Sequence, residues 1–184
     1  YQVDAFSEKL FSGNPAAVCI VKEWLPENIM QSIASENNLS ETAFVNISLN
    51  PFYIRWFTPE CEMGLCGHAT LASARVLFDE YLEENSSEII FQANRGKLRA
   101  IKEENLIYLD FPKDTPMPVE IDDKIKEALQ LKPRLLFRGI DDYLAILNSE
   151  EDVKRLELNF DKVSQLDSRG LIVSAQSKTT DFVC

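Results

Sequence analysis

The chain has 184 residues, of which 45% are hydrophobic and 27% are charged, and its formal net charge is −11 at pH 7. This composition is typical of a globular protein with one domain or two small ones. The negative charge argues against binding to nucleic acid, because contacts to phosphates require clustered Lys and Arg side chains. The longest apolar stretches, such as residues 16–21, are far shorter than the roughly 20 residues that cross a bilayer, so we expect no membrane partner.

Cysteine usage indicates the compartment. The four cysteines are an even number, but a chain of this length can build a core without disulfides. Three of them lie beside apolar residues, as reduced buried thiols do. We therefore expect reduced cysteines and a cytoplasmic location.

The first part of the chain alternates between strand and helix patterns. A turn formed by Ser12-Gly-Asn-Pro15 separates the first two strands. A helix is predicted to have Pro26 at its first position and to stop at Asn37-Asn38, because Asn tolerates the left-handed conformation that ends helices. Strands are predicted at residues 2–6, 16–22, 42–47 and 52–57.

A second helix is predicted from Gly67 to about residue 82, directly after Cys66. Apolar residues occupy most of its circumference in the early turns, which is typical of a buried helix rather than one that lies on the surface. Strands are predicted to follow it at residues 88–92, 97–102 and 106–111.

Residues 112–118 contain three prolines and indicate a boundary between domains at 1–112 and 113–184. Beyond it we predict helices at 121–131, after Ser149 and at 160–166, and strands at 143–147 and 170–175. A last apolar run occupies residues 181–184. The second domain has only about 70 residues, close to the lower limit for a self-sufficient core, so we expect it to be incomplete at its C-terminal end.

His68 is the only histidine, and it lies at the expected N-terminus of the buried helix. Free backbone N–H groups and the helix dipole favour an anion at such a position. One interpretation is that Cys66-Gly-His-Ala-Thr70 binds a carboxylate or phosphate of a substrate. The other is an ordinary capping turn with a hydrogen-bonded histidine, and spacing alone leaves both open.

A zinc site can be drawn from Cys61, Cys66 and His68, with Cys19 as a fourth ligand. Their spacing matches none of the usual structural zinc arrangements, so we expect no metal. The fingerprints of serine hydrolases, dinucleotide enzymes and P-loop NTPases are absent from the sequence in their common forms. We expect no cofactor.

Glu41 leads into an apolar strand, and near the anion-binding turn it could exchange protons with a substrate. By position alone, an exposed and inert glutamate is the favoured interpretation. Asp4 is a second unusual carboxylate, for which a hydrogen bond to a turn is favoured over catalysis. Ser12, Gly13 and Asn14 either line a pocket or simply turn the chain.

Five segments occur together in an order and spacing that point to one family. They are Val3-Asp-Ala-Phe6, Phe11-Ser-Gly-Asn-Pro-Ala-Ala-Val18, Asn38-Leu-Ser-Glu-Thr-Ala-Phe44, Arg55-Trp-Phe-Thr-Pro59 and Leu65-Cys-Gly-His-Ala-Thr70. The chain resembles the PhzF-like (PhzC/PhzF) isomerases of phenazine biosynthesis, whose fold is shared with diaminopimelate epimerase. The resemblance extends along essentially the whole chain.

The resemblance implies an α/β (α+β) fold of two pseudo-symmetric halves, each a curved mixed sheet around a central helix, with the active site between them. It assigns the acid/base role to Glu41 and substrate contacts to Gly67 and His68, and it places Asn14 in the same cleft. The expected activity is movement of a proton on a small anionic metabolite that bears a carboxylate, without metal or cofactor. A homodimer is consistent with this family.

Cys66 occupies the place of an acid/base thiol in the related epimerases, but Gly-His rather than Gly-Asn follows it. This favours a one-base mechanism through Glu41, with a thiol mechanism as the alternative. A non-catalytic ligand-binding or protein-interaction module remains a further hypothesis. The family motifs that supply the opposing wall of the site are not among these 184 residues, so we expect that wall to be missing here.

Overall fold

The computed structural model describes residues 1–9 and 11–184. The chain divides into two compact units, Tyr1–Pro112 and Lys113–Cys184, and the division falls at the start of the proline-rich segment. No helix among the described residues is both long and apolar enough to cross a membrane.

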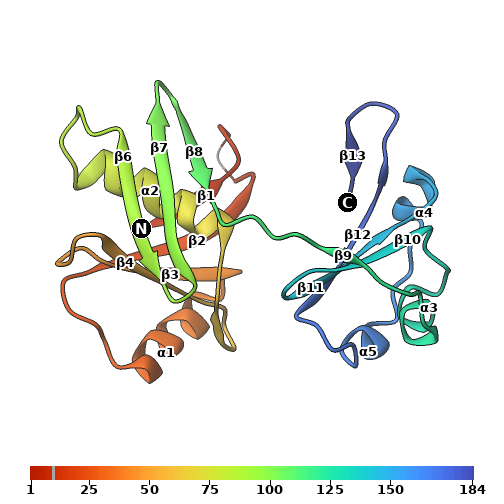
Figure 1. Ribbon diagram of the computed structural model, residues 1–184. Coiled ribbons are helices and arrows are strands. Elements are labelled where there is room, and N and C mark those ends of the chain that lie inside the picture. The colour runs from red at the N-terminus through yellow and green to blue at the C-terminus, as the bar shows by residue number, and fades with distance from the viewer. Residues whose placement is uncertain (10) are drawn as a thin grey trace. The chain divides into compact units, whose positions relative to one another are not determined.

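The first unit contains one mixed sheet and two helices (Figure 1). Its strands are β1 (Gln2–Ala5), β2 (Asn14–Val21), β3 (Glu41–Asn46), β4 (Phe52–Phe57), β5 (Glu62–Met63), β6 (Glu88–Ala93), β7 (Gly96–Glu103) and β8 (Leu106–Asp110). The strand order is β1-β2-β3-β4-β6-β7-β8, and β5 pairs with β4. The β2–β3 and β4–β6 pairs are parallel and the others are antiparallel.

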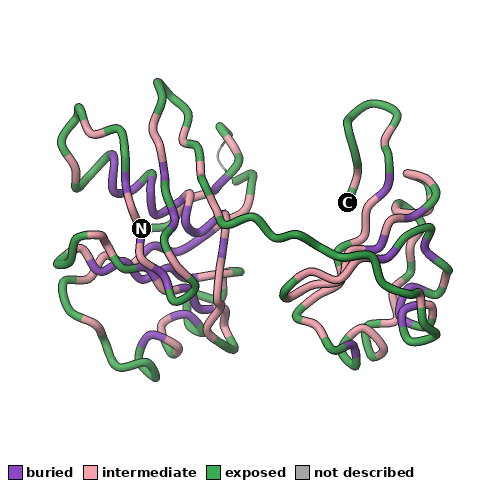
Figure 2. Tube along the Cα trace, in the orientation of Figure 1, coloured by how far each residue is buried: buried purple, intermediate pink, exposed green. Residues whose placement is uncertain are grey.

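Helix α2 (Gly67–Glu80) is the central element of this unit. It packs against β1, β2, β3 and β8, which lie at or near opposite ends of the strand order, so the sheet curves around it. The buried residues of α2 are His68, Ala69, Thr70, Ala72, Ser73, Ala74, Val76, Leu77 and Phe78. Figure 2 shows the same concentration of buried residues on α2 and the strands beside it. The prediction of a buried helix is confirmed, although Arg75 and Asp79 expose one face of α2 to solvent.

Helix α1 (Glu27–Asn37) covers the other face of the sheet. Met30 and Ala34 of α1 form a small core with Phe44 and Phe57. The helix ends at Asn38, which has the predicted left-handed conformation with φ of 49°. Pro26 is the N-cap residue rather than the first helical residue, a shift of one position that is common at helix ends.

The second unit contains a smaller mixed sheet with the order β13-β12-β11-β10-β9. Its elements are β9 (Met117–Pro118), α3 (Asp123–Leu129), β10 (Leu135–Arg138), β11 (Asp142–Ile146), α4 (Glu150–Lys154), α5 (Phe160–Val163), β12 (Gly170–Gln176) and β13 (Phe182–Val183). Only β11 and β12 pair in parallel. The Ser149 hydroxyl accepts a hydrogen bond from the Asp152 N–H at the start of α4, so the predicted cap is confirmed.

Three strands are absent from the sequence prediction. β5 and β9 have two residues each, and β9 lies in the proline-rich segment. β10 has four residues, which is too short for a periodic pattern to identify. Both β9 and β10 are held by their antiparallel neighbours, which a local pattern does not reveal.

Leu77 tests the packing around α2. Its side chain is fully buried, so we expect Leu77→Ala to lower the free energy of unfolding of the first unit by about 2–5 kcal/mol. Leu106→Ala is the matched control, because Leu106 is 60% exposed and its truncation should change stability by no more than about 0.5 kcal/mol. Urea unfolding followed by tryptophan fluorescence measures this, since both tryptophans, Trp24 and Trp56, lie in the first unit. Equal losses in the two variants would contradict the central role of α2.

Glu150 tests the contact between α4 and the segment before β13. The Lys154 ammonium, the Lys178 N–H and the Ser177 hydroxyl hold the pKa of Glu150 below its ordinary value of 4.5, at about 2. A carboxyl with a lowered pKa stabilises the fold above its unfolded pKa, and this stabilisation is lost as the pH falls from 4.5 towards 2. Wild type should therefore lose hydrogen-exchange protection at α4 and residues 177–178 between about pH 6 and about pH 3, whereas Glu150→Gln should change little over that range. The same pH dependence in both proteins would rule this out.

Candidate active site

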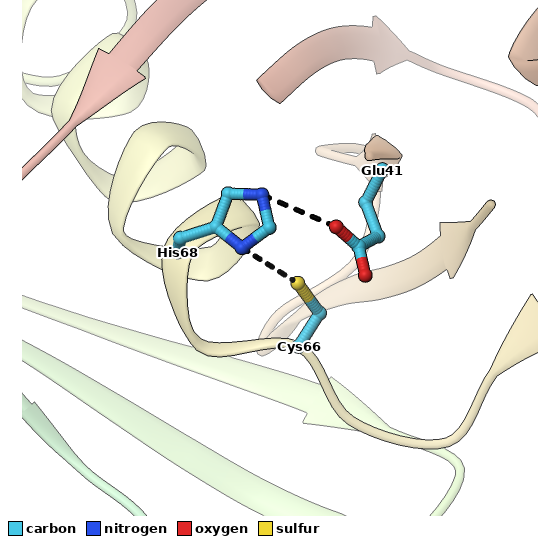
Figure 3. A group of neighbouring side chains, drawn as sticks. All are labelled: Glu41, Cys66 and His68. Atoms are coloured by element: carbon cyan, nitrogen blue, oxygen red, sulfur yellow. Dashed lines mark hydrogen bonds and ion pairs between the residues drawn. The ribbon is translucent and has the colours of Figure 1, made fainter. Parts of the chain in front are cut away.

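Three of the side chains singled out in the sequence meet at the N-terminus of α2 (Figure 3). His68 Nε2 lies 3.2 Å from Glu41 Oε2, and His68 Nδ1 lies 3.5 Å from Cys66 Sγ. His68 and Cys66 are 9% and 7% exposed, and the Glu41 side chain is 17% exposed. The imidazole therefore lies between a carboxylate at the edge of solvent and a buried thiol.

Strand alternation explains why Glu41 faces α2. Glu41 is the first residue of β3, and Ala43 and Val45 of the same strand pack into the core around α2. Successive side chains on a strand point to opposite faces, so Glu41 shares the face of Ala43 and Val45. Phe44 has the opposite parity and packs against α1.

Ser40 links this cluster to the turn before β2. Its Oγ lies 3.2 Å from His68 Nε2, 3.1 Å from Asn14 Oδ1 and 3.2 Å from the Pro15 carbonyl oxygen. The Pro15 carbonyl can only accept a hydrogen bond, and Asn14 Oδ1 is also an acceptor. We assign the single hydroxyl proton of Ser40 to one of these two, so that Ser40 accepts a hydrogen bond from His68 Nε2–H.

This network assigns the protonation of His68. Nε2 carries a proton and faces the Glu41 carboxylate and the Ser40 hydroxyl. No described residue donates a well-directed hydrogen bond to Glu41 Oε2, so its contact with Nε2 is electrostatic. Nδ1 accepts from a Cys66 thiol in the neutral ring, or donates to a thiolate in the imidazolium form.

The sequence did not indicate a role for Ser40, although this residue directly precedes Glu41 in the segment Asn38-Leu-Ser-Glu-Thr-Ala-Phe44. Its partner His68 is 28 positions away, so only tertiary packing brings the two together. Asn14 contacts Ser40 and thereby joins the same network as Glu41 and His68.

Gly67 is the first residue of α2 and follows the N-cap residue Cys66. Among the described residues, no side-chain capping bond forms from Cys66, and the first backbone bond of the helix runs from the Thr70 N–H to the Cys66 carbonyl. The N–H groups of Gly67 and His68 therefore have no partner inside the helix, as is general for the first turn. With the helix dipole, they form a site suited to an anion.

Asp4 is not part of this cluster. It lies on β1 and lines a separate cavity of 360 Å³ with residues of α2 and of the β7–β8 turn. The residues that line this cavity do not include Glu41, Cys66 or His68.

The zinc ligand set drawn from the sequence is not assembled. Cys19 packs against Phe44 on the α1 side of the sheet, and exposed Cys61 lies in a turn with Thr58. Of the three cysteines in the first unit, only Cys66 is buried, because it alone belongs to the core around α2. In the part of the chain that the structure describes, Glu41 joins Cys66 and His68 instead.

Comparison with known proteins places these features in a family. The family model for PhzC-PhzF, described as phenazine biosynthesis-like protein, matches residues 3–182. A Pseudomonas aeruginosa protein named "Uncharacterized isomerase" is 44% identical over 183 residues, which are 100% of this chain and 70% of the relative. A protein of Halalkalibacterium halodurans with the same description is 42% identical over 185 residues, covering 99% of this chain and 69% of the relative.

Solved structures agree with these relatives. The crystal structure of a phenazine biosynthesis protein of the PhzF family from Enterococcus faecalis matches with a TM-score of 0.85 and 44% sequence identity. The match covers 99% of this chain and 70% of that one. The predicted α/β fold with curved mixed sheets is confirmed.

The protonation of His68 can be measured directly, because the sequence contains one histidine. We expect the ¹⁵N chemical shift of Nε2 to be that of a protonated ring nitrogen, since Ser40 accepts a hydrogen bond on that side and the Glu41 carboxylate lies 3.2 Å away. Long-range ¹H–¹⁵N correlation spectra report it without ambiguity of assignment. Cys61→Ser is the control and should leave the spectrum unchanged. An unprotonated Nε2 would contradict the hydrogen-bond directions given above.

Proposed function

The chain belongs to the phenazine biosynthesis-like (PhzC-PhzF) family, and from this premise we propose that it moves a proton on a small metabolite that bears a carboxylate. Its relatives are named isomerases, which supports an isomerase-type enzyme. The proposed acid/base is Glu41, and the reaction needs neither metal nor cofactor.

The contact between Glu41 Oε2 and His68 Nε2 at the start of α2 carries this proposal. A carboxylate that acts as a general base must lie beside the substrate carbon. The site must also stabilise the negative charge that forms when the proton leaves that carbon. Here the Glu41 side chain is partly exposed although its Oε2 is buried, and the open amides of Gly67 and His68 lie in the adjoining helix turn. These groups supply a base and an anion site within one small cluster.

The proposed reaction has two steps. Glu41 accepts a proton from a carbon next to the substrate carboxyl group, and the electron pair of the broken C–H bond remains on the substrate as an enolate-like anion. The helix amides and the Nε2–H of His68 stabilise this anion. Glu41 then returns the proton to carbon at another position, so the protein ends in its starting state.

Cys66 gives a second candidate, a thiol-dependent epimerase, because its Sγ lies 3.5 Å from His68 Nδ1. Such a mechanism needs a second thiol on the other side of the substrate. Cys19 is half-buried on the opposite face of the sheet, where it packs against the core beneath α1, and Cys61 lies in an exposed turn, so neither supplies that thiol in the first unit. The one-base mechanism through Glu41 is therefore the better supported of the two.

Substrate-dependent exchange of deuterium from heavy water tests the role of Glu41. With a panel of small carboxylic acids, we expect Glu41→Gln to slow the exchange by about 100-fold or more, because the amide cannot accept the proton. Glu36→Gln is the matched control, since Glu36 is exposed on α1 and should be dispensable. Exchange that is equally fast in wild type and Glu41→Gln would exclude Glu41 as the base.

Cys66→Ser separates the remaining hypotheses in the same assay. The one-base mechanism predicts that this variant keeps most of its exchange activity, whereas a thiol mechanism predicts its loss. A non-catalytic binding module predicts no exchange with any acid in the wild-type protein.

A further inference from the structure

We propose that Glu41, Cys66 and His68 bind a thiophilic divalent cation, Zn²⁺, and that the bound ion blocks proton transfer by Glu41. The binding site follows from the geometry of the cluster. The inhibitory consequence rests on the function proposed above.

The donor atoms are those that zinc prefers. A thiolate sulfur, an imidazole nitrogen and a carboxylate oxygen are the usual protein ligands of Zn²⁺. One such atom from each of the three residues lies within 4.8 Å of the others. Figure 3 shows the carboxylate of Glu41 and the sulfur of Cys66 directed at the two ring nitrogens of His68.

The spacing is close to that of a coordinated ion. Bonds of about 2.0–2.3 Å in a tetrahedron hold neighbouring ligand atoms roughly 3.3–3.8 Å apart. The Cys66 Sγ–His68 Nδ1 distance is 3.5 Å, within this range. Nδ1 is also the ring nitrogen that carries no proton in the neutral form assigned above, so it has a lone pair for the metal.

Glu41 can become the third zinc ligand if its carboxylate rotates. Its Oε2 faces Nε2, on the other side of the ring from Sγ, so the carboxylate must rotate towards the thiol to share the ion. This movement breaks no directed hydrogen bond to Oε2 from a described residue, and the side chain lies at the edge of solvent. Water can then occupy a fourth position, as in zinc sites with three protein ligands.

The position of Cys66 lets its sulfur reach the ion. Cys66 is the N-cap residue of α2, a helix of 14 residues, and its Sγ lies 3.5 Å from His68 Nδ1 in the first turn of that helix. Binding releases the thiol proton to solvent and leaves the charge of the site balanced by the metal.

The sequence does not reveal this site, because the spacing of Cys61, Cys66 and His68 is unlike that of known zinc motifs. The third ligand, Glu41, comes instead from β3, which packs against α2. A carboxylate that coordinates zinc cannot accept a proton from carbon. The ion is therefore expected to inhibit the enzyme rather than to act as its cofactor.

Metal binding is tested on the intact protein without any substrate. Metal-free protein is titrated with Zn²⁺ against a chromophoric chelator, and with Co²⁺ while the thiolate-to-cobalt charge-transfer absorption is recorded. We expect one ion per chain and a charge-transfer band. Cys66→Ser should abolish the band and weaken zinc binding by at least about 100-fold, and Glu41→Gln should keep the band and weaken binding by about 10–100-fold.

Cys61→Ser and Cys184→Ser are the matched controls and should bind both ions as wild type does. The absence of the band in wild type, its survival in Cys66→Ser, or its loss in Cys61→Ser would each overturn the proposed site. Because Glu41→Gln is nearly isosteric, it keeps the test decisive even when Cys66→Ser folds poorly.

Inhibition is tested separately by the deuterium-exchange assay. Zn²⁺ should stop exchange at the concentration that fills the site, a chelator should restore it, and Mg²⁺ should have no effect because it prefers oxygen ligands. Exchange that persists with the site filled, or that requires zinc, would overturn the inhibitory role. The absence of exchange in metal-free protein would count against the proposed function and leave the binding result untouched.

Discussion

The burial of α2 over most of its circumference is the constraint on which the first unit depends. A sheet can curve around a helix only when the covered surface is apolar and its side chains are small enough for strands to approach. Ala69 and Ala72 meet that condition on one side of α2 and Ala74 meets it on another. The curved sheet then brings β2 and β3 to the N-terminal end of the helix, where Asn14 and Glu41 begin those strands.

The burial of α2 also explains why polar groups gather at its N-terminus. A buried helix cannot leave its first amides without partners unless water, a side chain or a ligand reaches them. At α2 the N-cap residue is a cysteine, whose sulfur makes no capping bond among the described residues. The polar groups gathered there, from Ser40 and Glu41 on one side and Cys66 on the other, all converge on the one imidazole of His68.

The proposed proton transfer and the proposed metal binding would compete for these groups. A carboxylate, an imidazole and a thiol can exchange protons because each has a free lone pair in one protonation state, and the same lone pairs bind a soft cation. Which of the two prevails depends on whether the carboxylate of Glu41 stays by Nε2 or rotates towards Sγ. Membership of the family supports the proposal of proton transfer, and the three donor side chains Glu41, Cys66 and His68 support the proposal that zinc inhibits it.

Local patterns in the sequence were enough to predict four features: β4 at residues 52–57, the buried helix α2, the stop of α1 at Asn38 and the cap at Ser149. Each of these depends on side chains a few positions apart, so its pattern can be read along the chain. The sequence also indicated the family, through five motifs that occur in a specific order and spacing.

The contacts between those motifs could be seen only in the tertiary structure. The contact of Ser40 with His68 and the position of Glu41 beside Cys66, where Cys61 was expected, depend on how β3 packs against α2. Asp4 is separate from the cluster because β1 carries it to another cavity. Such long-range contacts follow from strand pairing and packing, which local patterns do not specify.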